Sequence, residues 1–334
     1  MPRSDPPTLG VAIVAYNSAD VILACLDSLR ASTGAVLRIV VTDNQSQDDT
    51  VAAITTWAAA QGADFTFVLA TADSIAPPSA ALTLLRSPVN GGYAHGVNSG
   101  LTLLLADPAI DLFWVLNPDC VAAPGAAAAY LAAGTDQDFA LMSGRTLFHD
   151  RPDQIQTDGG RVSRWTGVCR SVGAGQSAAS ALPAPASLDF LTGANIVASR
   201  RFIAAAGLMV ADYFLFYEEV DWAFRRGNLP LRLVADAQVF HHGGTAIGSG
   251  SVRRRASAFA NYFNHRNRIR FVRRFLPLAL PGALAMSLAK AAQLILTGGR
   301  AEGWAILAGS FGLPAPAAVR DRLSPAALRV ALGR

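Results

Sequence analysis

The stretch that decides the fold is "DLFWVLNPDCV", residues 111–121. Its five consecutive apolar or aromatic residues, 112–116, are typical of a β-strand that is buried on both faces. The chain then turns at Asn117-Pro118-Asp119, which places an amide and a carboxylate directly after this strand. In open α/β sheets, ligands bind beyond the carboxyl ends of the strands. The stretch therefore predicts a parallel sheet with a ligand site near Asn117 and Asp119.

Outward from this strand, the first half of the chain alternates between apolar runs, which predict strands, and apolar residues at helical spacing, which predict helices. The expected strands are 9–16, 37–42, 65–70 and 112–116, and the expected helices are 19–32, 46–62, 96–107 and 124–134. Such alternation predicts an α/β fold with a mostly parallel sheet covered by helices. After residue 139 we expect short strands and loops, then a helical acidic segment at 217–227, a strand at 231–240 and basic helices from about 252.

Two further strand ends carry polar side chains, Tyr16-Asn17 and Asp43-Asn44. Asp43 has an alternative interpretation, because an Asp after a strand can cap the next helix or begin a turn. The first strand–helix turn, "AYNSAD", contains no glycine, and the chain has no P-loop pattern. This argues against both common glycine-rich nucleotide cradles, and therefore against a nicotinamide-dependent oxidoreductase.

The composition limits the class of partner. The 334 residues carry a formal net charge of +4, and basic residues gather at 253–255 and 265–275. A basic and apolar C-terminal part favours an acidic substrate or an anionic lipid surface over nucleic acid. The three cysteines are too scattered for a disulfide framework or a zinc site. The N-terminus has no apolar signal region, so we expect a cytoplasmic protein.

Residues 276–296 are about long enough to cross a bilayer, although two prolines and Lys290 interrupt them. The basic stretch before them suits a helix lying at an anionic membrane surface. Three alternatives stay open: a membrane span, a surface-lying helix and a plain buried helix.

Seven segments occur in a characteristic order: "VAIVAYNSADVILACLDSL", "RIVVTDNQSQDDT", "NGGYAHGVNSGL", "FWVLNPDC", "LTGANIVASRRFIAAAGL", "YFLFYEEVDWAFR" and "NYFNHRNRIRF". Together they resemble the inverting family-2 glycosyltransferases, and most closely the bacterial rhamnosyltransferases. The resemblance runs from about residue 9 to 275. It implies the GT-A fold, in which a Rossmann-like sheet binds a nucleotide sugar and an acceptor subdomain follows, here with a helical, basic and apolar C-terminal extension.

The resemblance implies a nucleotide-sugar site formed by Tyr16, Asn17, Asp43, Asn90, Gly92, Asn98, Asn117 and Arg266. Asp43 would bind the base, and Asn117 would contact the ribose, directly or through water. The loop at 90–98 precedes a helix and suits a phosphate or sugar contact, or else a tight, closely packed turn. Arg266 and Asn267 match a pair that would reach the diphosphate, or would form a structural salt bridge.

Asn117-Pro118-Asp119 resembles the family's variant of the Asp-x-Asp metal motif. By this resemblance Asp119 would bind Mg²⁺ or Mn²⁺ at the diphosphate, since hard cations prefer oxygen ligands. His241 matches a histidine that completes the metal or diphosphate site, and His242 is the alternative. A soft-metal site is not expected, because no cysteine is expected nearby.

The acidic segment "YEEVDWAFR" aligns Glu219 with the family's catalytic base, with Glu218 and Asp221 as alternatives. The segment departs from the family, which has Asp at this position. Acids in the first turn of a helix also interact favourably with its dipole, which is the structural alternative.

We therefore expect a metal-dependent inverting glycosyltransferase that moves rhamnose from dTDP-rhamnose to a cell-surface glycan or lipid-linked acceptor. It would act at the inner face of the cell membrane, with no nucleic-acid partner. The alternatives are a UDP-galactofuranose transferase and a non-catalytic nucleotide-sugar or glycan-binding module. Its parts would be a nucleotide-sugar-binding half (1–122), an acceptor-binding and catalytic half (123–248) and a helical C-terminal region (249–334).

Overall fold

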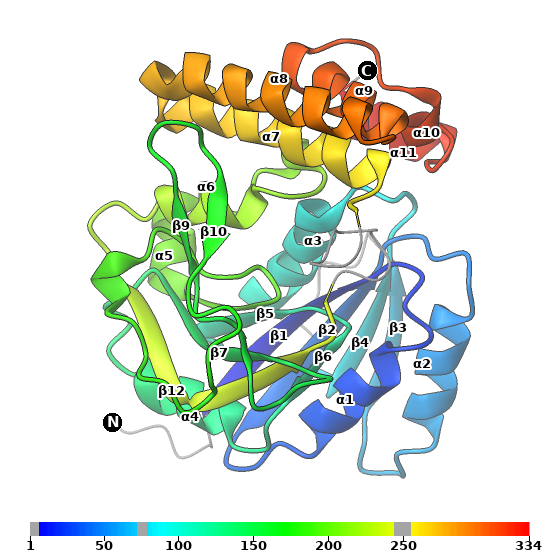
Figure 1. The fold of residues 1–334 in the computed structure, drawn as a ribbon. Coiled ribbons are helices and arrows are strands. Elements are labelled where there is room, and N and C mark those ends of the chain that lie inside the picture. Colours follow the sequence, from blue (N-terminus) through cyan, green and yellow to red (C-terminus); the bar gives the residue numbers. More distant parts are fainter. Residues whose placement is uncertain (1–6, 72–78, 244–254, 334) are drawn as a thin grey trace.

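One large sheet organises the molecule (Figure 1). The computed structural model describes residues 7–71, 79–243 and 255–333. The strand order is β3-β4-β2-β1-β5-β11-β7-β12-β6, and β8 pairs with β7. The strands are β1 (Thr8–Ala15), β2 (Val36–Asp43), β3 (Phe67–Thr71), β4 (Leu82–Arg86), β5 (Leu112–Leu116), β6 (Cys120–Ala122), β7 (Leu141–Phe148), β8 (Ile155–Thr157), β11 (Asn195–Ser199) and β12 (Leu231–His241). A separate hairpin consists of β9 (Gly160–Val162) and β10 (Cys169–Ser171).

The pairing confirms the predicted mostly parallel α/β fold. β1 is parallel to both β2 and β5, and β4 is parallel to both β2 and β3. β11 runs antiparallel between β5 and β7. β4 was not among the expected strands, because its leucines and the preceding alanines are good helix formers and carry no strand-specific pattern. Since β5 pairs with β11, residues on both sides of position 122 belong to the same sheet. The expected boundary at 248/249 lies outside the described residues.

Helices cover both faces of the sheet. They are α1 (Ile22–Arg30), α2 (Thr50–Ala59), α3 (Tyr93–Leu105), α4 (Ala126–Ala133), α5 (Arg200–Ala206), α6 (Glu218–Phe224), α7 (Ala258–Phe275), α8 (Leu280–Leu296), α9 (Arg300–Phe311), α10 (Ala317–Arg320) and α11 (Pro325–Leu332). Phe113 and Val115 of β5 join one core cluster with α3, whereas Trp114 joins the other with α1 and α4. This confirms that β5 is buried on both faces.

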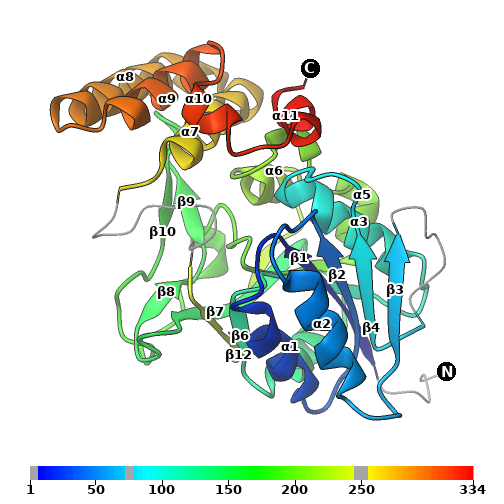
Figure 2. The same cartoon turned by 90° about the vertical axis from the view of Figure 1, so that its right-hand side faces the viewer.

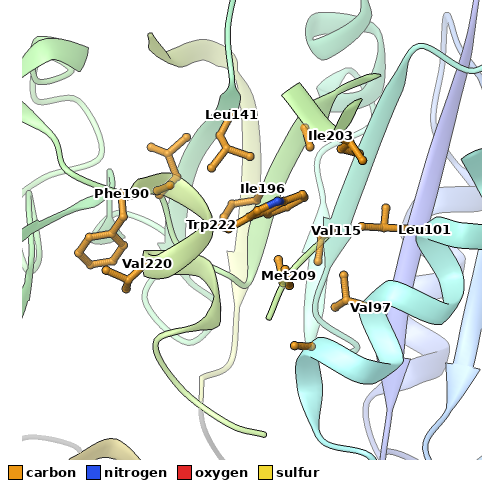
Figure 3. Packing of buried hydrophobic residues seen from close by; sticks show 14 of the residues in the cluster. Val97, Leu101, Val115, Leu141, Phe190, Ile196, Ile203, Met209, Val220 and Trp222 are labelled. Carbon is orange, nitrogen blue, oxygen red and sulfur yellow. The ribbon is translucent and has the colours of Figure 1, made fainter. Parts of the chain in front are cut away.

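The short helix α6 is anchored in the core by its apolar side chains. Val220 and Trp222 point into the cluster that contains Ile196 of β11 and Val115 of β5 (Figure 3). The Trp222 indole N–H also donates to the carbonyl oxygen of Gly207, 2.9 Å away. Because these apolar residues hold the helix, the acids in its first turn have a defined position.

The C-terminal helices confirm the expected basic helical region. α7 and α8 lie across one end of the molecule, beside α6 and the β9–β10 hairpin (Figures 1 and 2). Residues Pro277–Leu296 form a helical stretch that, by length and composition alone, could cross a membrane, and only 28% of its apolar window is buried. Its buried residues, among them Ala283, Ser287 and Ala291, share one face of α8. The plain buried helix is therefore the alternative that fits least.

Candidate functional site

Two strand ends bring Asp119 and His241 together. β12 runs antiparallel to β6, with His241 opposite Cys120. The backbone N–H of His242 donates to the carbonyl oxygen of Asp119 at 3.1 Å, and that of Asn117 donates to Ala194 at 3.0 Å. The turn after β5 is therefore held between β12 and the segment that leads into β11, at the place where an α/β sheet binds its ligands.

The Asp119–His241 pair has the geometry of two acceptors that face each other. His241 Nε2 lies 3.2 Å from Asp119 Oδ1. His241 Nδ1 lies 2.5 Å from Gln156 Oε1, while the Gln156 amide nitrogen donates to the His241 carbonyl oxygen. This second bond orients the Gln156 amide, so Nδ1–H is the donor and Nε2 is the ring nitrogen that can offer a lone pair. Nε2 is buried and makes no well-directed hydrogen bond among the described residues.

The same residues suit a divalent cation. Burial opposes ionisation of Asp119, yet the pKa of this carboxyl lies below its usual range, in part because backbone N–H groups stabilise the carboxylate. A carboxylate oxygen and an imidazole nitrogen with converging lone pairs bind a cation well, and an outer partner such as Gln156 commonly orients the histidine of a metal site. The side chain of Asn117 adds a buried carbonyl oxygen without a donor in the described part of the chain.

Cys120 corrects one expectation, namely that no cysteine lies near this site. The ligand atoms of Asp119, Cys120 and His241 all lie within 4.8 Å of one another. The cysteine is nevertheless in the thiol form, because burial and the Asp119 charge raise its pKa well above the usual range, and its S–H donates to the Ala194 carbonyl oxygen at 3.5 Å. Asp119 and His241 are therefore the ligands that suit a hard cation.

His242 does not join this pair. Its exposed ring stacks on the ring of His149, with centroids 3.7 Å apart. Burial and the neighbouring His149 lower the pKa of His242, so its ring is neutral at neutral pH. Of the two histidines considered, the structure brings only His241 to Asp119.

The residues expected at the nucleotide base lie where β1 and β2 end. Asp43 is buried and its Oδ1 accepts the Ser46 N–H at 3.2 Å, as in the turn-forming alternative. The exposed Asn17 has a positive φ of 50° and accepts the Gln47 N–H at 2.8 Å. Tyr16 beside it is partly exposed, and its backbone N–H donates to Ser18. These three residues share one edge of the sheet, as expected.

Residues 90–92 of the glycine-rich stretch form a closely packed turn, and residues 93–98 are the first part of α3. Asn44, which follows β2, donates to Asn90 Oδ1 and to the Gly92 carbonyl oxygen, both at 3.0 Å. Gly92 has φ +85°, and a Cβ there would stand 2.2 Å from the Phe214 carbonyl oxygen. Asn98 donates to and accepts from the backbone of Met209. The loop thus ties the end of β2 to the segment before α6.

The three acids of α6 have different surroundings. Asp221 is fully buried and bonded to Arg225 at 2.7 Å, Arg274 at 2.9 Å and the Tyr213 hydroxyl at 3.0 Å. This set of partners is that of a structural ion pair, so Asp221 has no free oxygen for a substrate. Glu218 is buried, and its Oε2 has no donor in the described residues. Burial raises the pKa of Glu218, and the charge of Glu219 raises it further.

Glu219 is half-buried and lies against Gly193, in the segment between the hairpin and β11. Burial raises its pKa as well. A methyl group added at Gly193 would stand 3.6 Å from the Cβ and Cγ atoms of Glu219, so the two residues are in contact. Tyr93 donates its hydroxyl to the Gly193 carbonyl oxygen at 2.7 Å. Burial and the charges of nearby acidic residues, Glu218 and Glu219 first among them, raise the pKa of Tyr93.

The backbone before α6 is strained and is held by α7. Phe214, Phe216 and Tyr217 all have positive φ, between 63° and 73°, which costs of order 1–3 kcal/mol for each such residue. The side-chain amide of Asn267 donates to the carbonyl oxygens of residues 213, 215 and 216, at 2.7, 2.6 and 3.0 Å. Arg266 donates to Tyr213 and Ala331 and makes no ion pair within the described residues, so the salt-bridge alternative does not hold.

Several residues that shape the site were not singled out from the sequence, namely Gln156, Gly193, Asn44 and Tyr93. Tyr93 lies within the glycine-rich segment and Asn44 follows Asp43. Both segments were therefore noted in the sequence, although neither residue was assigned a role. Gln156 and Gly193 lie in stretches without any motif, and only the pairing of distant strands reveals them.

The first part of the chain matches a known protein family. Residues 10–154 match the family described as Glycosyl transferase family 2. None of the curated proteins compared with the chain matches it.

Solved structures share the fold. The structure of GalNAc-T7 with UDP, GalNAc and Mn²⁺ superposes with a TM-score of 0.56 at 14% identity, over 81% of this chain and 48% of that one. The mannosyltransferase PcManGT from Pyrobaculum calidifontis, in complex with GDP-Man and Mn²⁺, gives 0.51 at 16% identity, over 98% of this chain and 81% of that one. The chain thus spans about half the length of the first of these proteins, and the similarity shows a GT-A-like fold.

Proposed function

On the premise that residues 10–154 form a glycosyl transferase family 2 domain, we propose that this protein is a metal-dependent inverting glycosyltransferase. The observation that carries the proposal is the pair of facing acceptors, Asp119 and His241, at the carboxyl ends of the strands, together with two glutamates of raised pKa at the start of α6. The donor is a sugar attached to a nucleoside diphosphate. Both structural neighbours are described with a nucleotide or sugar nucleotide and Mn²⁺, which supports the same cofactor class here.

In this mechanism Asp119 and His241 would hold Mg²⁺ or Mn²⁺, and Gln156 orients the His241 imidazole for that role. The cation would supply positive charge to offset the negative charge that develops on the leaving diphosphate. The nucleoside lies along the sheet edge formed by Tyr16, Asn17 and Asp43. Residues 90–98 form the side of the nucleotide-sugar site that is nearer to α6.

Glu219 acts as the base. It accepts the proton of the acceptor hydroxyl while that oxygen forms a bond to the anomeric carbon and the bond to the diphosphate breaks on the opposite face. A single displacement of this kind inverts the anomeric centre. The raised pKa suits the role, because a stronger base accepts a proton more readily at neutral pH. Its neighbour Glu218 is buried deeper and raises the proton affinity of the pair.

The donor proposed is dTDP-rhamnose and the acceptor a cell-surface glycan or lipid-linked sugar. The support is the resemblance of the motifs to bacterial rhamnosyltransferases.

The experiment is a thermal-shift panel of nucleotide sugars with Mn²⁺, Mg²⁺ or chelator, on the wild type, on Asp119→Ala and on Asp64→Ala as an exposed control. Binding to the native state raises the melting temperature. We expect one donor to act, only with metal, in the wild type and the control. A shift that persists in chelator and in Asp119→Ala would sink the metal-diphosphate proposal.

We further propose that the enzyme works at a membrane surface. Leu278, Leu296 and Trp165 are 97%, 85% and 82% exposed. Trp165 lies in the loop between β9 and β10, and its backbone packs against Gly282 near the start of α8, so Trp165 and Leu278 are both exposed near the same end of that helix. Arg273 and Arg274 end the neighbouring α7. Exposed apolar residues beside cations suit an anionic bilayer surface. Sedimentation with phosphatidylglycerol vesicles should fall for Trp165→Ser with Leu278→Ser; equal sedimentation would refute this contact.

A further inference from the structure

A cavity of about 280 Å³ lies among the C-terminal helices, between the second half of α7, the end of α9 and the end of α11. It shares no lining residue with the strand-end site described above. Its volume is near the lower end of small-molecule sites, which is roughly 300 Å³. It therefore suits a compact chemical group.

The wall formed by α7 is strongly basic. Arg266, Arg270 and Arg273 follow one another at helical spacing, so their guanidinium groups share one face and line the cavity. None of the three forms an ion pair in the described part of the chain, although like charges at this spacing repel one another. Arg266 is only 8% exposed, and a buried charge without a counter-charge is costly.

Arg266 and Arg270 are hydrogen-bonded to neutral groups. Arg266 donates to the carbonyl oxygens of Ala331 and Tyr213 and to the Asn267 side chain, and Arg270 donates to the carbonyl oxygen of Asp212. The Asp212 carboxylate is near enough to favour the charged form of Arg266 but outside ion-pair distance. Burial, and then the charge of Arg270, lower the pKa of Arg266 to about 10. The cavity thus holds an excess of positive charge.

Part of the lining is apolar. It includes Ile269 of α7, Phe311 at the end of α9 and Leu313 just after that helix. Phe311 and Leu313 are 44% and 39% exposed, so apolar surface continues from the cavity to the outside. Basic residues in the cavity and exposed apolar residues at its opening suit an amphiphile with an anionic head group.

We propose that this cavity binds the phosphate or diphosphate group of an amphiphilic phosphate ester, with the three arginines on the phosphate and the chain leaving over Phe311 and Leu313. Guanidinium groups match phosphate oxygens in pairs, which makes arginine the usual residue for such recognition. The proposal does not depend on the transferase function.

The test uses farnesyl diphosphate, inorganic diphosphate and farnesol as probes in titration calorimetry on the whole chain. All titrations contain chelator, so that a metal-dependent diphosphate site at Asp119 does not contribute. We expect farnesyl diphosphate to bind more tightly than either half alone. Arg270→Ala and Arg273→Ala should each weaken binding about tenfold, since each removes a charge-assisted hydrogen bond. Arg300→Ala, which removes a charge outside the cavity, should change it less than about twofold.

Three outcomes would overturn the proposal. Equal affinity in the wild type and in Arg270→Ala with Arg273→Ala would show that the arginines bind no phosphate. Equal affinity for inorganic and farnesyl diphosphate would show that the apolar chain contributes nothing to binding. The cavity would then be a site for free phosphate or diphosphate, and the proposed amphiphilic ligand would be refuted. Binding that appears only when Mn²⁺ replaces chelator, and disappears in Asp119→Ala, would move the ligand to the strand-end site. Arg270 and Arg273 are both exposed, so their substitution should not disturb folding. Circular dichroism checks that the variants fold.

Discussion

At the scale of single residues, Gln156 decides which nitrogen of His241 carries the proton. Its amide accepts from Nδ1 and is itself oriented by the His241 carbonyl oxygen. Gln156→Leu should weaken Mn²⁺ binding about 10- to 100-fold, because the imidazole loses its fixed tautomer and orientation. Mn²⁺ titration followed by electron paramagnetic resonance measures this without any activity assay. Gln154→Leu, two residues away, is the matched control. Unchanged affinity in Gln156→Leu would refute the positioning role.

Glu218 should make stability depend on pH. Its folded pKa is raised above the usual 4.5 by burial and by Glu219, so the folded state holds a proton that the unfolded state releases. The stabilisation is complete below pH 4.5 and is lost as the pH rises towards the folded pKa. Glu218→Gln should therefore be more stable than the wild type at pH 8, by on the order of a few kcal/mol, and the difference should vanish near pH 4. Denaturant unfolding measures it.

The control for this prediction is Glu302→Gln in α9, since the chain contains only three glutamates and Glu302 lies outside the acidic segment. A pH-independent difference between Glu218→Gln and the wild type would contradict the prediction.

Substitution of Glu219 should lower the rate of sugar transfer and leave donor binding unchanged. Glu219→Gln removes the proposed base, and the loss of general base catalysis typically costs about 10²- to 10⁴-fold in rate. The wild-type rate should fall as the pH drops through the raised carboxyl pKa, since only the ionised form accepts a proton. Donor-induced thermal stabilisation should persist in the variant. Full activity in Glu219→Gln together with loss in Glu218→Gln would transfer the role to Glu218.

At the scale of elements, α7 holds the strained segment that leads into α6. The Asn267 amide serves three of its carbonyl oxygens. Asn267→Ala should cost about 1–3 kcal/mol of stability, because buried carbonyl groups lose their donor. It should also lower the rate, because Glu219 loses its fixed position, while Mn²⁺ affinity stays unchanged. Asn261→Ala, on the same helix, is the control. If Asn267→Ala loses stability but keeps the full transfer rate, Asn267 is not needed to position the segment that carries Glu219.

At the scale of the whole molecule, the C-terminal helices belong to the same core as the sheet. Ile269, Phe271 and Val272 of α7 lie in one cluster with Trp222 of α6. Deleting residues 255–334 should therefore abolish cooperative unfolding, not merely release the protein from a membrane. Thermal unfolding followed by near-ultraviolet circular dichroism measures this. Trp165→Ser with Leu278→Ser should leave the melting temperature unchanged, because both side chains are exposed. A deletion that unfolds cooperatively would make the C-terminal region a separate unit.

Local patterns in the sequence were enough to predict the α/β class, the strand at 112–116 and the polar strand end at Asn117-Pro118-Asp119. These features depend on a residue's immediate neighbours, because hydrophobic periodicity and turn residues act over one strand or helix. β4 escaped this reasoning, since its leucines and flanking alanines suit a helix as well as a strand.

Tertiary structure alone decided which of the candidate residues meet. The resemblance favoured His241 over His242, and in the structure the pairing of β12 with β6 brings His241 to Asp119 while His242 stacks on His149. It favoured Glu219 with Glu218 and Asp221 as alternatives, and burial separates Asp221, which pairs with two arginines, from the poorly solvated Glu218 and Glu219. Arg266 proved to lie in a basic cavity of the C-terminal helices. Such differences depend on contacts between residues far apart in the chain and on their burial, and no local pattern records either.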